Sequence, residues 1–577
     1  MSAAARISPV TSQPGDLTAA WNGADGRPVQ VVVKVPRPLH GLTVELSPSA
    51  AGNSAAILSA LARLREAGGG ELRLKPGLYR IASEDTERNP LLSLDGLTDV
   101  TITGKGATLM LMRWGTGIRI RNSQRVRLAD FELRYANPAL VTGSIVQTAG
   151  GLGLAIGPAQ LSADAQPVVH QITTLNPRGP GYAIHGTRLI FGKAGVTFRP
   201  AGKGVFTTVG KLVGFQPGDR VAIKLTYYDG AALSVNDSAG LASQDIVVDH
   251  VTIANSSGMA ITVGRMGRGL GVINSRLGPA TAADGVASIP FDGIHVAAMA
   301  GDILIQNNHI SGTGDDGINL SSPVLDVLGT GEAGVVNIKN AGAFAPQETL
   351  ALFDADLKYL GSSTVNGRAP TGPDRTSAVQ LASTIPNVQL ARYARAASTV
   401  GSRYAIIGNT IADCECHGLL AQGPNGLISK NQFSGLRYNA IRLLTSGVWN
   451  EGSGATNVVV VDNVIHDTGA DTKLGFLWGA ISAYGEIGTL GGPSHMTSVP
   501  VNSGLLITGN TITNTQDVCV SISDTEDATL THNHCDQTML GGASKTGSFG
   551  NSANDDKRRR LGIWIDPKTT ANIVFDQ

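Results

Sequence analysis

The sequence predicts an all-β protein, a right-handed parallel β-helix, from three observations: a repeat one coil long, a high glycine content and few charges. The chain of 577 residues contains 73 Gly, and only 16% of its residues are charged. A Gly inside a helix costs roughly 0.5–1 kcal/mol relative to Ala, whereas short strands joined by tight turns accommodate it. The composition therefore favours a solenoid of many short strands.

The repeat is carried by Asn residues in apolar segments that end in Asn-x-Ile or a close variant. Asn409 to Asn431 is 22 residues, and Asn510 to Asn533 is 23. Two further copies contain Asn308 and Asn463. A period near 22 is one turn of a parallel β-helix, whose strands stack about 4.8 Å apart. We expect these Asn side chains to form an internal ladder of amide hydrogen bonds.

Two other all-β or solenoid folds fit the sequence less well. A leucine-rich repeat has a similar period, but its Leu-x-x-Leu-x-Leu pattern is absent. A β-sandwich would show hairpin signals about every 8–12 residues instead.

The N-terminal part predicts a helix that covers the open end of the solenoid, where the first coil would otherwise expose its core. Asn53 is expected to cap the start of this helix, and the helix is expected to end at the three Gly residues 68–70. Its expected apolar face consists of Ile57, Leu58, Leu61 and Leu64.

Two Gly-rich stretches, 145–240 and 322–402, interrupt the repeat. Both are too long to be structureless loops, so we predict two small β-rich, barrel-like inserts. The predicted domains are a lead segment at 1–50, the cap and first coils at 51–144, the first insert at 145–240, coils with the candidate site at 241–321, the second insert at 322–402, and C-terminal coils and tail at 403–577.

Charge and hydropathy exclude two classes of partner. The 45 basic and 45 acidic residues balance, which removes the electrostatic case for nucleic acid. No apolar run of about 20 residues predicts a membrane span. The first residues lack the apolar core of a signal peptide, so we expect a periplasmic or secreted protein whose export signal is not part of this chain, with a cytoplasmic location left open. The oligomeric state is also left open, a homodimer being one option.

The four cysteines are predicted to be buried apolar side chains. Cys414 and Cys416 resemble a metal-binding pair, but Cys519 and Cys535 do not supply a second pair with ligand spacing.

Three aspartates dominate the candidate chemistry. They occur in Asp292-Gly293 and in Asp315-Asp316-Gly317, and Asp292 to Asp316 is 24 residues, about one coil. Aligning the glycines places Asp292 and Asp316 in one column, with Asp315 as the diagonal neighbour. Stacked carboxylates repel each other, which raises at least one pKa and leaves an acid beside ionised partners, as acid/base catalysis requires. A calcium site and plain surface turns are the alternatives.

These residues resemble motifs of two families of β-helical glycoside hydrolases. In the polygalacturonases, family 28, the matching motifs are Asn-Thr-Asp-Gly and Gly-Asp-Asp. Pro290-Phe291 stands here in place of Asn-Thr, and Cys416-His417-Gly418 partly matches that family's Gly-His-Gly. Its Arg-Ile-Lys motif is missing unless Arg442 stands in for it.

The sequence is more similar to glycoside hydrolase family 110, the inverting α-galactosidases that include α-1,3-galactosidases. The likeness lies in Asp292-x-x-His295 and in Gly314-Asp315-Asp316-x-x-Asn319. That family also has β-barrel inserts where this chain breaks its repeat. The resemblance implies that Asp315 is the general acid and that Asp292 and Asp316 position and deprotonate the water. We expect no cofactor and leave a structural calcium ion open.

Several side chains around the aspartates are candidates for binding a sugar. His295 and Asn319 follow the two Asp motifs, and the glycine alignment places His417 in the same column. Each of the three could instead have a structural role. Further candidates in the following coil and loops are Arg437, Tyr438, Trp449, Glu451, Trp478 and Glu486.

The sequence therefore leads to the hypothesis of an inverting exo-acting glycoside hydrolase that releases a terminal α-linked, galactose-like sugar. The alternatives are a polysaccharide lyase, a transglycosidase or an endo-polygalacturonase-like enzyme on the same β-helix, and a non-catalytic adhesin or tail-spike. A lyase would use Lys or Arg as base, and the sequence shows no basic cluster beside its acids.

Overall fold

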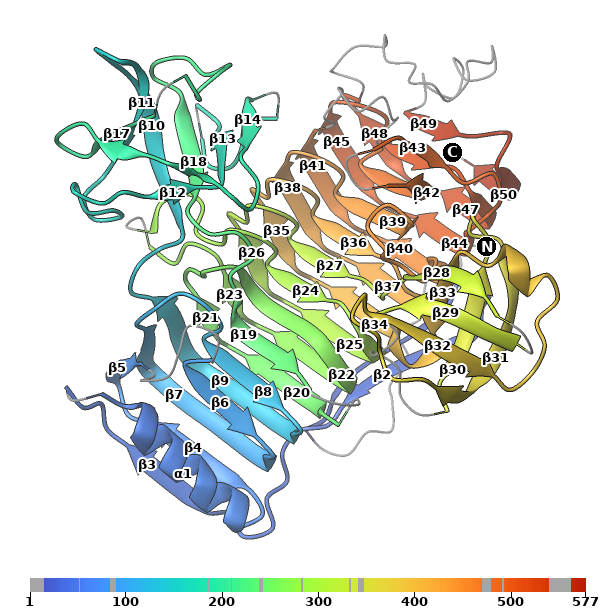
Figure 1. Ribbon diagram of the computed structural model, residues 1–577, viewed down its shortest axis with the longest axis horizontal. Coiled ribbons are helices and arrows are strands. Elements are labelled where there is room, and N and C mark those ends of the chain that lie inside the picture. Colours follow the sequence, from blue (N-terminus) through green and yellow to red (C-terminus); the bar gives the residue numbers. More distant parts are fainter. Residues whose placement is uncertain are drawn as a thin grey trace.

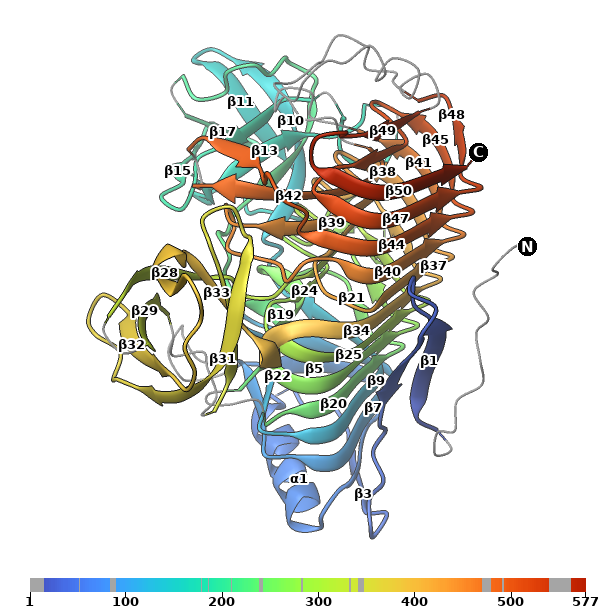
Figure 2. The same ribbon diagram turned by 90° about the vertical axis from the view of Figure 1, so that its right-hand side faces the viewer.

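The computed structural model is a long stack of short parallel strands with two smaller β units on one side (Figures 1 and 2). It confirms the predicted fold class, a parallel β-helix with an N-terminal helix and β-rich inserts. The structure describes residues 15–50, 52–82, 90–177, 179–184, 186–208, 210–237, 242–281, 284–331, 334–340, 347–469, 479–489, 492–538 and 562–576.

The parallel sheet that carries the candidate aspartates runs the length of the stack. Each strand pairs in register with the strand one coil further on. Its strands in stacking order are β6 (Leu92–Asp95), β8 (Ile118–Arg121), β19 (Ala231–Asn236), β22 (Met259–Ile273), β24 (Ile294–Val296), β27 (Ile318–Leu320), β36 (Leu419–Ala421), β39 (Ile441–Ser446), β42 (Ile481–Gly488), β46 (Val520–Ile522) and β49 (Ile563–Ile565).

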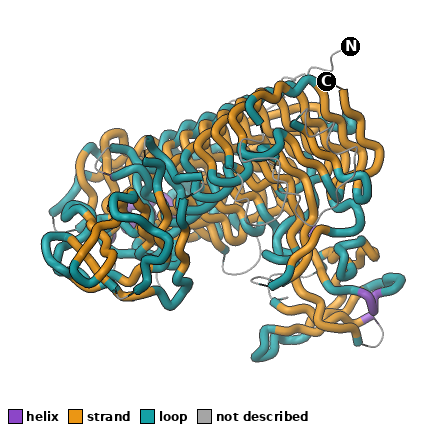
Figure 3. The backbone as a smooth tube through the Cα atoms, turned by 90° about the horizontal axis from the view of Figure 1, so that it is seen from above, coloured by secondary structure: helices purple, strands orange, loops and turns teal. Residues whose placement is uncertain are grey.

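The rest of each coil consists of two further stacks of parallel strands. Figure 3 shows the coils of the β-helix from above. The longer stack contains β3 (Thr43–Leu46), β4 (Gly70–Leu74), β7 (Thr98–Leu111), β9 (Gln124–Tyr135), β20 (Gln244–Asp249), the end of β22, β25 (Met299–Gln306), β34 (Val400–Ile407), β37 (Gly426–Ser429), β40 (Thr456–Val461), β44 (Asn502–Thr508), β47 (Thr525–Thr531) and β50 (Thr570–Asp576). The shorter stack begins with β5 (Gly77–Ile81) and the ends of β7 and β9, and continues through β21 (Thr252–Ile253), β23 (Arg276–Leu277), β26 (His309–Ser311), β35 (Thr410–Ala412), β38 (Gln432–Leu436), β41 (Val464–Thr468), β45 (Thr511–Thr515) and β48 (His534–Asp536).

A ladder of Asn side chains joins successive coils inside the turn between these two stacks. Each Nδ2 donates to the Oδ1 of the Asn one coil further on, over 2.8–2.9 Å, and so does each backbone N–H, over 2.9–3.2 Å. The ladder consists of Asn308, Asn409, Asn431, Asn463, Asn510 and Asn533. The predicted ladder is thus confirmed.

Helix α1 (Ser54–Glu66) packs against the first coils, as predicted, although two details differ. Leu58 is 42% exposed, because Ala60 rather than Leu58 faces the core beside Ile57 and Leu61. The side chain of Asn53, the residue before the helix, bonds to the backbone of Ser49 and caps no helix N–H.

An N-terminal hairpin, β1 (Leu17–Asn22) and β2 (Pro28–Val33), lies along the outside of the stack, on the side away from the inserts (Figure 2). Its buried side chains, such as Trp21 and Val31, pack on outward-facing apolar residues of several coils, including Leu304 and Val459.

Two units of antiparallel strands stand on one side of the β-helix (Figure 2). The N-terminal insert is a seven-stranded sheet with β12 (Val168–Val169) and β15 (Val196–Thr197) beside it; in sheet order its strands are β14 (Arg188–Ile190), β13 (Gln171–Thr174), β18 (Arg220–Lys224), β10 (Leu140–Thr148), β11 (Gly151–Ile156), β17 (Val205–Thr207) and β16 (Arg199–Pro200). The barrel insert is closed by β28 (Leu325–Thr330), β29 (Val335–Lys339), β32 (Thr376–Leu381), β31 (Tyr359–Arg368), β30 (Thr349–Phe353) and β33 (Tyr393–Ala396). Each unit has its own apolar core.

The cysteine prediction is half wrong. Cys414 and Cys416 are buried and free, as expected. Cys519 and Cys535 form a disulfide, because the last coils bring two residues 16 positions apart to a Cα–Cα distance of 6.0 Å. Among the described residues, no helix has the length and apolar character needed to span a membrane.

We expect Asn431→Ala to lower the free energy of unfolding by about 2–4 kcal/mol, since it removes the Oδ1 that accepts from the buried Asn409 backbone N–H and from Asn409 Nδ2, and takes one donor from Asn463 Oδ1. Urea unfolding followed by circular dichroism measures this loss. The matched control is Asn22→Ala at the exposed end of β1, for which we expect a change within roughly 0.5 kcal/mol. Equal stability of the two variants would show that the ladder contributes nothing.

Candidate active site

The candidate carboxylates lie in the turns immediately before β24 and β27. The Asp316 N–H donates to Asp292 Oδ1 over 3.2 Å, and the His417 N–H donates to Asp316 Oδ1 over 2.9 Å. Each carboxylate thus accepts the backbone N–H of the equivalent residue one coil further on. Asp292, Asp316 and His417 therefore stand in the single column that the glycine alignment predicts.

The glycine after each of these residues is required by the stacking. The Gly293 N–H donates to Asp316 O, and the Gly317 N–H donates to His417 O. A Cβ on Gly293 would lie 2.6 Å from Gly317 O, and a Cβ on Gly317 would lie 2.6 Å from Gly418 O. No other side chain fits so close to a carbonyl oxygen. Glycine lets these turns stack directly, and this brings the preceding Asp side chains together.

Burial raises the pKa of two of the three carboxyl groups. Asp292 is 3% exposed, and its burial raises its pKa to about 6. A hydrogen bond from His295 opposes this rise, and the charge of Asp315 adds to it. The pKa of Asp316 lies well above its ordinary value because of burial first, then repulsion from Asp315 and Asp292. The raised pKa values favour the protonated forms of both buried carboxyls, which is a condition for acid/base catalysis by neighbouring carboxyls.

Asp315 is the one partly exposed carboxyl of the three, and an aromatic pair borders it. The Tyr228 hydroxyl donates to Asp315 Oδ2 over 3.3 Å. The Tyr228 ring stacks on Phe291 with 3.9 Å between centroids, and Tyr227 contacts both rings edge-on. Burial and the charge of Asp315 raise the pKa of Tyr228, so its hydroxyl keeps the proton that it donates.

Sequence reasoning missed Tyr227 and Tyr228, which follow β18 of the N-terminal insert. Two adjacent Tyr residues in a chain with only 5% aromatics are a signal of a binding surface. The sequence does not show, however, that the insert places them beside Asp315.

A buried ion cluster joins the same insert to the coil that follows the acids. Glu415 is fully buried and accepts hydrogen bonds from Gln171 and Thr173 over 2.6–2.8 Å. Its carboxylate also pairs with Arg188 Nε at 2.8 Å and with Lys224 Nζ at 3.5 Å. Burial alone would raise the pKa of Glu415, but the two cations outweigh it and the pKa is lowered.

Lys224 reaches from this ion cluster to the acid motif itself. Its Nζ donates to Gly314 O over 2.6 Å and lies 4.7 Å above the centre of the Phe291 ring. The sequence shows no basic cluster beside the acids, but the fold brings one basic group, Lys224, to the acid motif. Lys224 and Arg188 are distant in sequence, and only the docking of the insert places them there.

His295, Asn319 and Glu451 form a polar line that starts at Asp292. His295 Nδ1 lies 2.6 Å from Asp292 Oδ2, and this contact raises the pKa of His295 although burial alone would lower it. His295 and Asn319 are register partners in β24 and β27. Asn319 Oδ1 accepts from Gln422 Nε2 at 3.1 Å, and Asn319 Nδ2 donates to Glu451 at 3.5 Å.

His417, Tyr438 and Glu486 meet around Arg442 in the next coils. The rings of His417 and Tyr438 lie 5.2 Å apart. Arg442 Nη1 lies 3.1 Å from His417 Nε2, and Arg442 Nη2 lies 3.3 Å from Glu486 Oε1. Burial and the charge of Arg442 hold the pKa of His417 well below its ordinary value, so the imidazole is neutral.

The remaining candidates are Arg437, Trp449 and Trp478. Arg437 donates to the Gly186 carbonyl of the N-terminal insert over 3.1 Å. Trp449 is 55% exposed in the loop after β39, where its backbone N–H donates to Ser446 Oγ. Trp478 lies outside the described residues.

One group of potential metal ligands occurs at the site. Asp315, Asp316 and Cys416 each present one ligand atom, and these atoms lie within 4.8 Å of one another. Calcium takes six to eight oxygen ligands, so a set that includes a thiol fits it poorly. Burial, followed by the charge of Asp315, raises the pKa of the Cys416 thiol, which disfavours the thiolate that a softer metal needs.

Fold and site together define a parallel β-helix with a carboxyl cluster on one sheet, bordered by aromatic rings. No protein-family model matches the sequence, and neither does any curated protein. Solved structures similar to the chain include a polygalacturonase from Erwinia carotovora (11% identity, 94% of this chain and 99% of that one, TM-score 0.43), a family 28 exopolygalacturonase from Yersinia enterocolitica (10%, 96% and 82%, 0.43) and the A-module of mannuronan C-5 epimerase AlgE6 from Azotobacter vinelandii (14%, 91% and 96%, 0.41). These similarities are too low to carry an argument about function, which depends here on the site itself.

We expect Asp316→Asn to fold and to melt no lower than the wild type at pH 7. Asn Oδ1 still accepts the His417 N–H, and the substitution removes the cost of ionising a buried carboxyl. Because the folded-state pKa values of Asp316 and Asp292 are raised, the contribution of these two carboxyls to stability is greatest below about pH 4 and declines as pH rises through about 6. Thermal melting from pH 4 to pH 7 should show a smaller decline in the variant. A much lower melting temperature at pH 7 only would mean that a bound cation compensates the wild-type charge.

Proposed function

We propose that this protein is an inverting, exo-acting glycoside hydrolase that releases a terminal α-linked, galactose-like sugar from a carbohydrate. The observation that carries the proposal is the carboxyl cluster itself. Two buried acids with raised pKa values, Asp292 and Asp316, lie beside the partly exposed Asp315, which the exposed ring of Tyr228 contacts.

We assign a role to each of the three acids from its exposure and spacing. Asp315 is the accessible carboxyl, and as general acid it would protonate the glycosidic oxygen while the bond to the anomeric carbon breaks. An inverting enzyme needs about 6.5–9.5 Å between acid and base to admit a water. Ligand atoms of Asp315 and Asp316 lie within 4.8 Å, which is too close for such a pair, and we therefore assign the base to Asp292 and the positioning of the water to Asp316.

Asp292 has the properties of such a base. A pKa of about 6 leaves it largely ionised at neutral pH, yet more basic than an ordinary carboxylate. It would take a proton from the water whose oxygen bonds to the anomeric carbon. His295 holds its other oxygen at 2.6 Å and fixes its orientation.

The N-terminal insert supports exo action rather than binding in an open groove. It contributes Tyr227 and Tyr228 beside Asp315, and the Glu415 ion cluster fixes its position. Aromatic rings are suitable walls for a sugar because they present a rigid apolar face and a polar edge.

The N-terminal insert supplies two cations, Lys224 and Arg188, but they do not support the lyase alternative. Lys224 is 3% exposed and is engaged with Glu415, Gln171 and the Gly314 carbonyl. Arg188 is paired with Glu415. Neither group is available to remove a proton from a substrate.

A periplasmic or secreted location is part of the proposal. The Cys519–Cys535 disulfide supports it, since disulfides persist mainly in oxidising compartments.

The first test is proton NMR of the protein with α- and β-linked galactosides and uronide oligomers. We expect the β-anomer of free galactose to appear first from an α-linked substrate, and Asp315→Asn to lower the rate at least about 100-fold. The matched control is Asp130→Asn, an exposed carboxyl far along the chain, with unchanged rate. Unsaturated uronide signals would assign the protein to the lyases instead, and first release of the α-anomer would exclude inversion.

A second test uses the pH dependence of kcat/KM. Activity should rise with pH through about 6, as Asp292 ionises. His295→Phe removes the hydrogen bond that lowers the pKa of Asp292, so the rising limb should move to higher pH. The control is His309→Phe, in β26. A limb that stays in place in His295→Phe would remove Asp292 from the role of base.

A further inference from the structure

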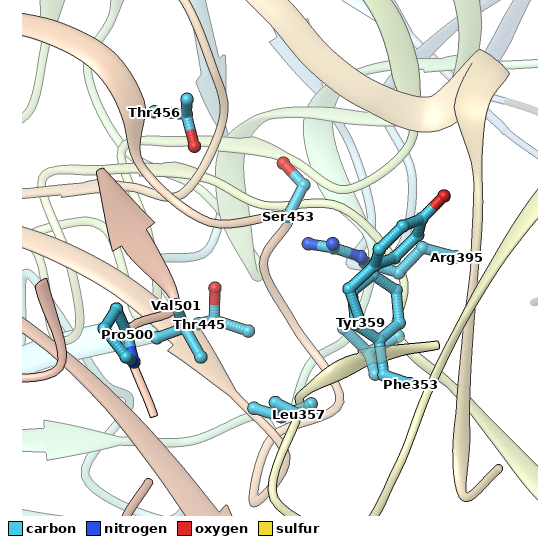
Figure 4. A pocket seen from close by; sticks show the side chains of 10 residues that line it. Phe353, Leu357, Tyr359, Arg395, Thr445, Ser453, Thr456, Pro500 and Val501 are labelled. Carbon is cyan, nitrogen blue, oxygen red and sulfur yellow. The ribbon is translucent and has the colours of Figure 1, made fainter. Parts of the chain in front are cut away.

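A cavity of about 210 Å³ lies between the barrel insert and the coils of the β-helix, away from the acid cluster. The barrel contributes Phe353, Tyr359 and Arg395 to its wall, and the coils and their loops contribute residues such as Thr445 and Ser453 (Figure 4). The volume far exceeds the share of liquid that one water occupies, about 30 Å³, so the cavity admits a small ligand.

Arg395 differs from the other enclosed arginines near the inserts. Arg188 pairs with Glu415, and Arg442 with Glu486. Arg395 has neither an ion pair nor a side-chain hydrogen bond within the described part of the chain, and its guanidinium lies 4.0 Å above the centre of the Phe353 ring. A cation on a cavity wall that has no anionic partner among the described residues can bind an anion that enters the cavity.

The charge of Arg395 faces the cavity. Its side chain is partly exposed there, and Figure 4 shows the guanidinium extending from the barrel toward Ser453. Burial lowers the pKa of Arg395 to about 10, and no charged neighbour contributes to the shift. At neutral pH the group is therefore still a cation.

The remaining wall suits a sugar ring. Tyr359 is 57% exposed at the rim, with its ring centre 5.7 Å from that of Phe353. Thr445 and Ser453 add hydroxyl groups. Aromatic rings and hydroxyl groups of this kind contact a pyranose, whereas an inorganic anion needs no contact with the ring of Tyr359.

One loop connects this cavity with the proposed active site. Residues 447–453 follow β39; within them, Glu451 accepts from Asn319, and Ser453 lines the cavity. The Ser453 hydroxyl also donates to the backbone of Gln422, whose amide contacts Asn319. Both sites thus lie on the same side of the β-helix.

We propose that this cavity binds an acidic sugar unit, with Arg395 holding its carboxylate or sulfate and Tyr359 contacting its ring. The planar guanidinium fits either oxyanion through paired N–H donors. The choice of a sugar as the carrier of the anion rests on the proposed function, whereas the anion site rests on Arg395 alone. The substrate or product carbohydrate would then carry a negative charge at a distance from the bond that is cleaved.

Isothermal titration calorimetry of the full chain tests the proposal with galacturonate, galactose 6-sulfate, neutral galactose and sodium sulfate. We expect at least one acidic sugar to bind at least about tenfold tighter than galactose. Arg395→Met should weaken that binding about tenfold or more, and Arg395→Lys should weaken it less. The matched control is Arg392→Met, which removes an exposed arginine of the same barrel and should bind as the wild type does.

Tyr359→Ala provides a variant that leaves the buried wall intact. This substitution should weaken the binding of the acidic sugar and leave the binding of sulfate unchanged. Equal affinity for sulfate and the acidic sugars, with no effect of Tyr359→Ala, would overturn the sugar assignment. Absence of binding, or wild-type affinity in Arg395→Met, would overturn the anion site. Neither result depends on hydrolysis, so a failure here is distinct from a failure of the Asp315→Asn test.

Discussion

Direct stacking of one coil on the next is the constraint on which the rest of this structure depends. Equivalent residues of neighbouring coils are held at strand spacing, about 4.8 Å, so each residue contacts the residue at the same position in the next coil. Asn satisfies this constraint because its amide both donates and accepts, which allows Asn409, Asn431 and Asn463 to bond in sequence. Glycine satisfies it where a turn meets the carbonyl of the next turn, as at Gly293 and Gly317.

The same stacking brings the carboxyl groups of the site close enough to repel one another when they are ionised. Asp292 and Asp316 occupy positions in a column where each side chain accepts a backbone N–H from the next coil. An Asn would make that hydrogen bond without a charge. Carboxylates at both positions, beside Asp315, cost desolvation and repulsion that the ladder does not require, and the raised pKa values are the result. This excess over structural need is the physical reason for placing the chemistry here.

The two inserts add chemically distinct surfaces to a repetitive fold. The N-terminal insert is anchored by Glu415, whose carboxylate binds Arg188 and Lys224, and it brings Tyr228 to Asp315. The barrel insert instead encloses a cation, Arg395, that has no protein anion beside it within the described residues. In the first case the charges are balanced inside the protein, and in the second the balance is left to a ligand.

The features that repeat along the chain could be predicted from the amino-acid sequence: the β-helix, the Asn ladder, and the column of Asp292, Asp316 and His417. A repeat of one coil converts sequence spacing directly into spatial contact, so the alignment of the glycines predicts the column. The distant segments that meet this column are known only from the three-dimensional fold. Tyr228, Lys224 and Arg395 belong to inserts whose docking follows no period, and the partners of Cys519 and Glu415 depend on how the coils and inserts pack. The positions of these residues depend on burial and charge pairing between segments joined by long loops. Local patterns in the sequence do not predict such long-range contacts.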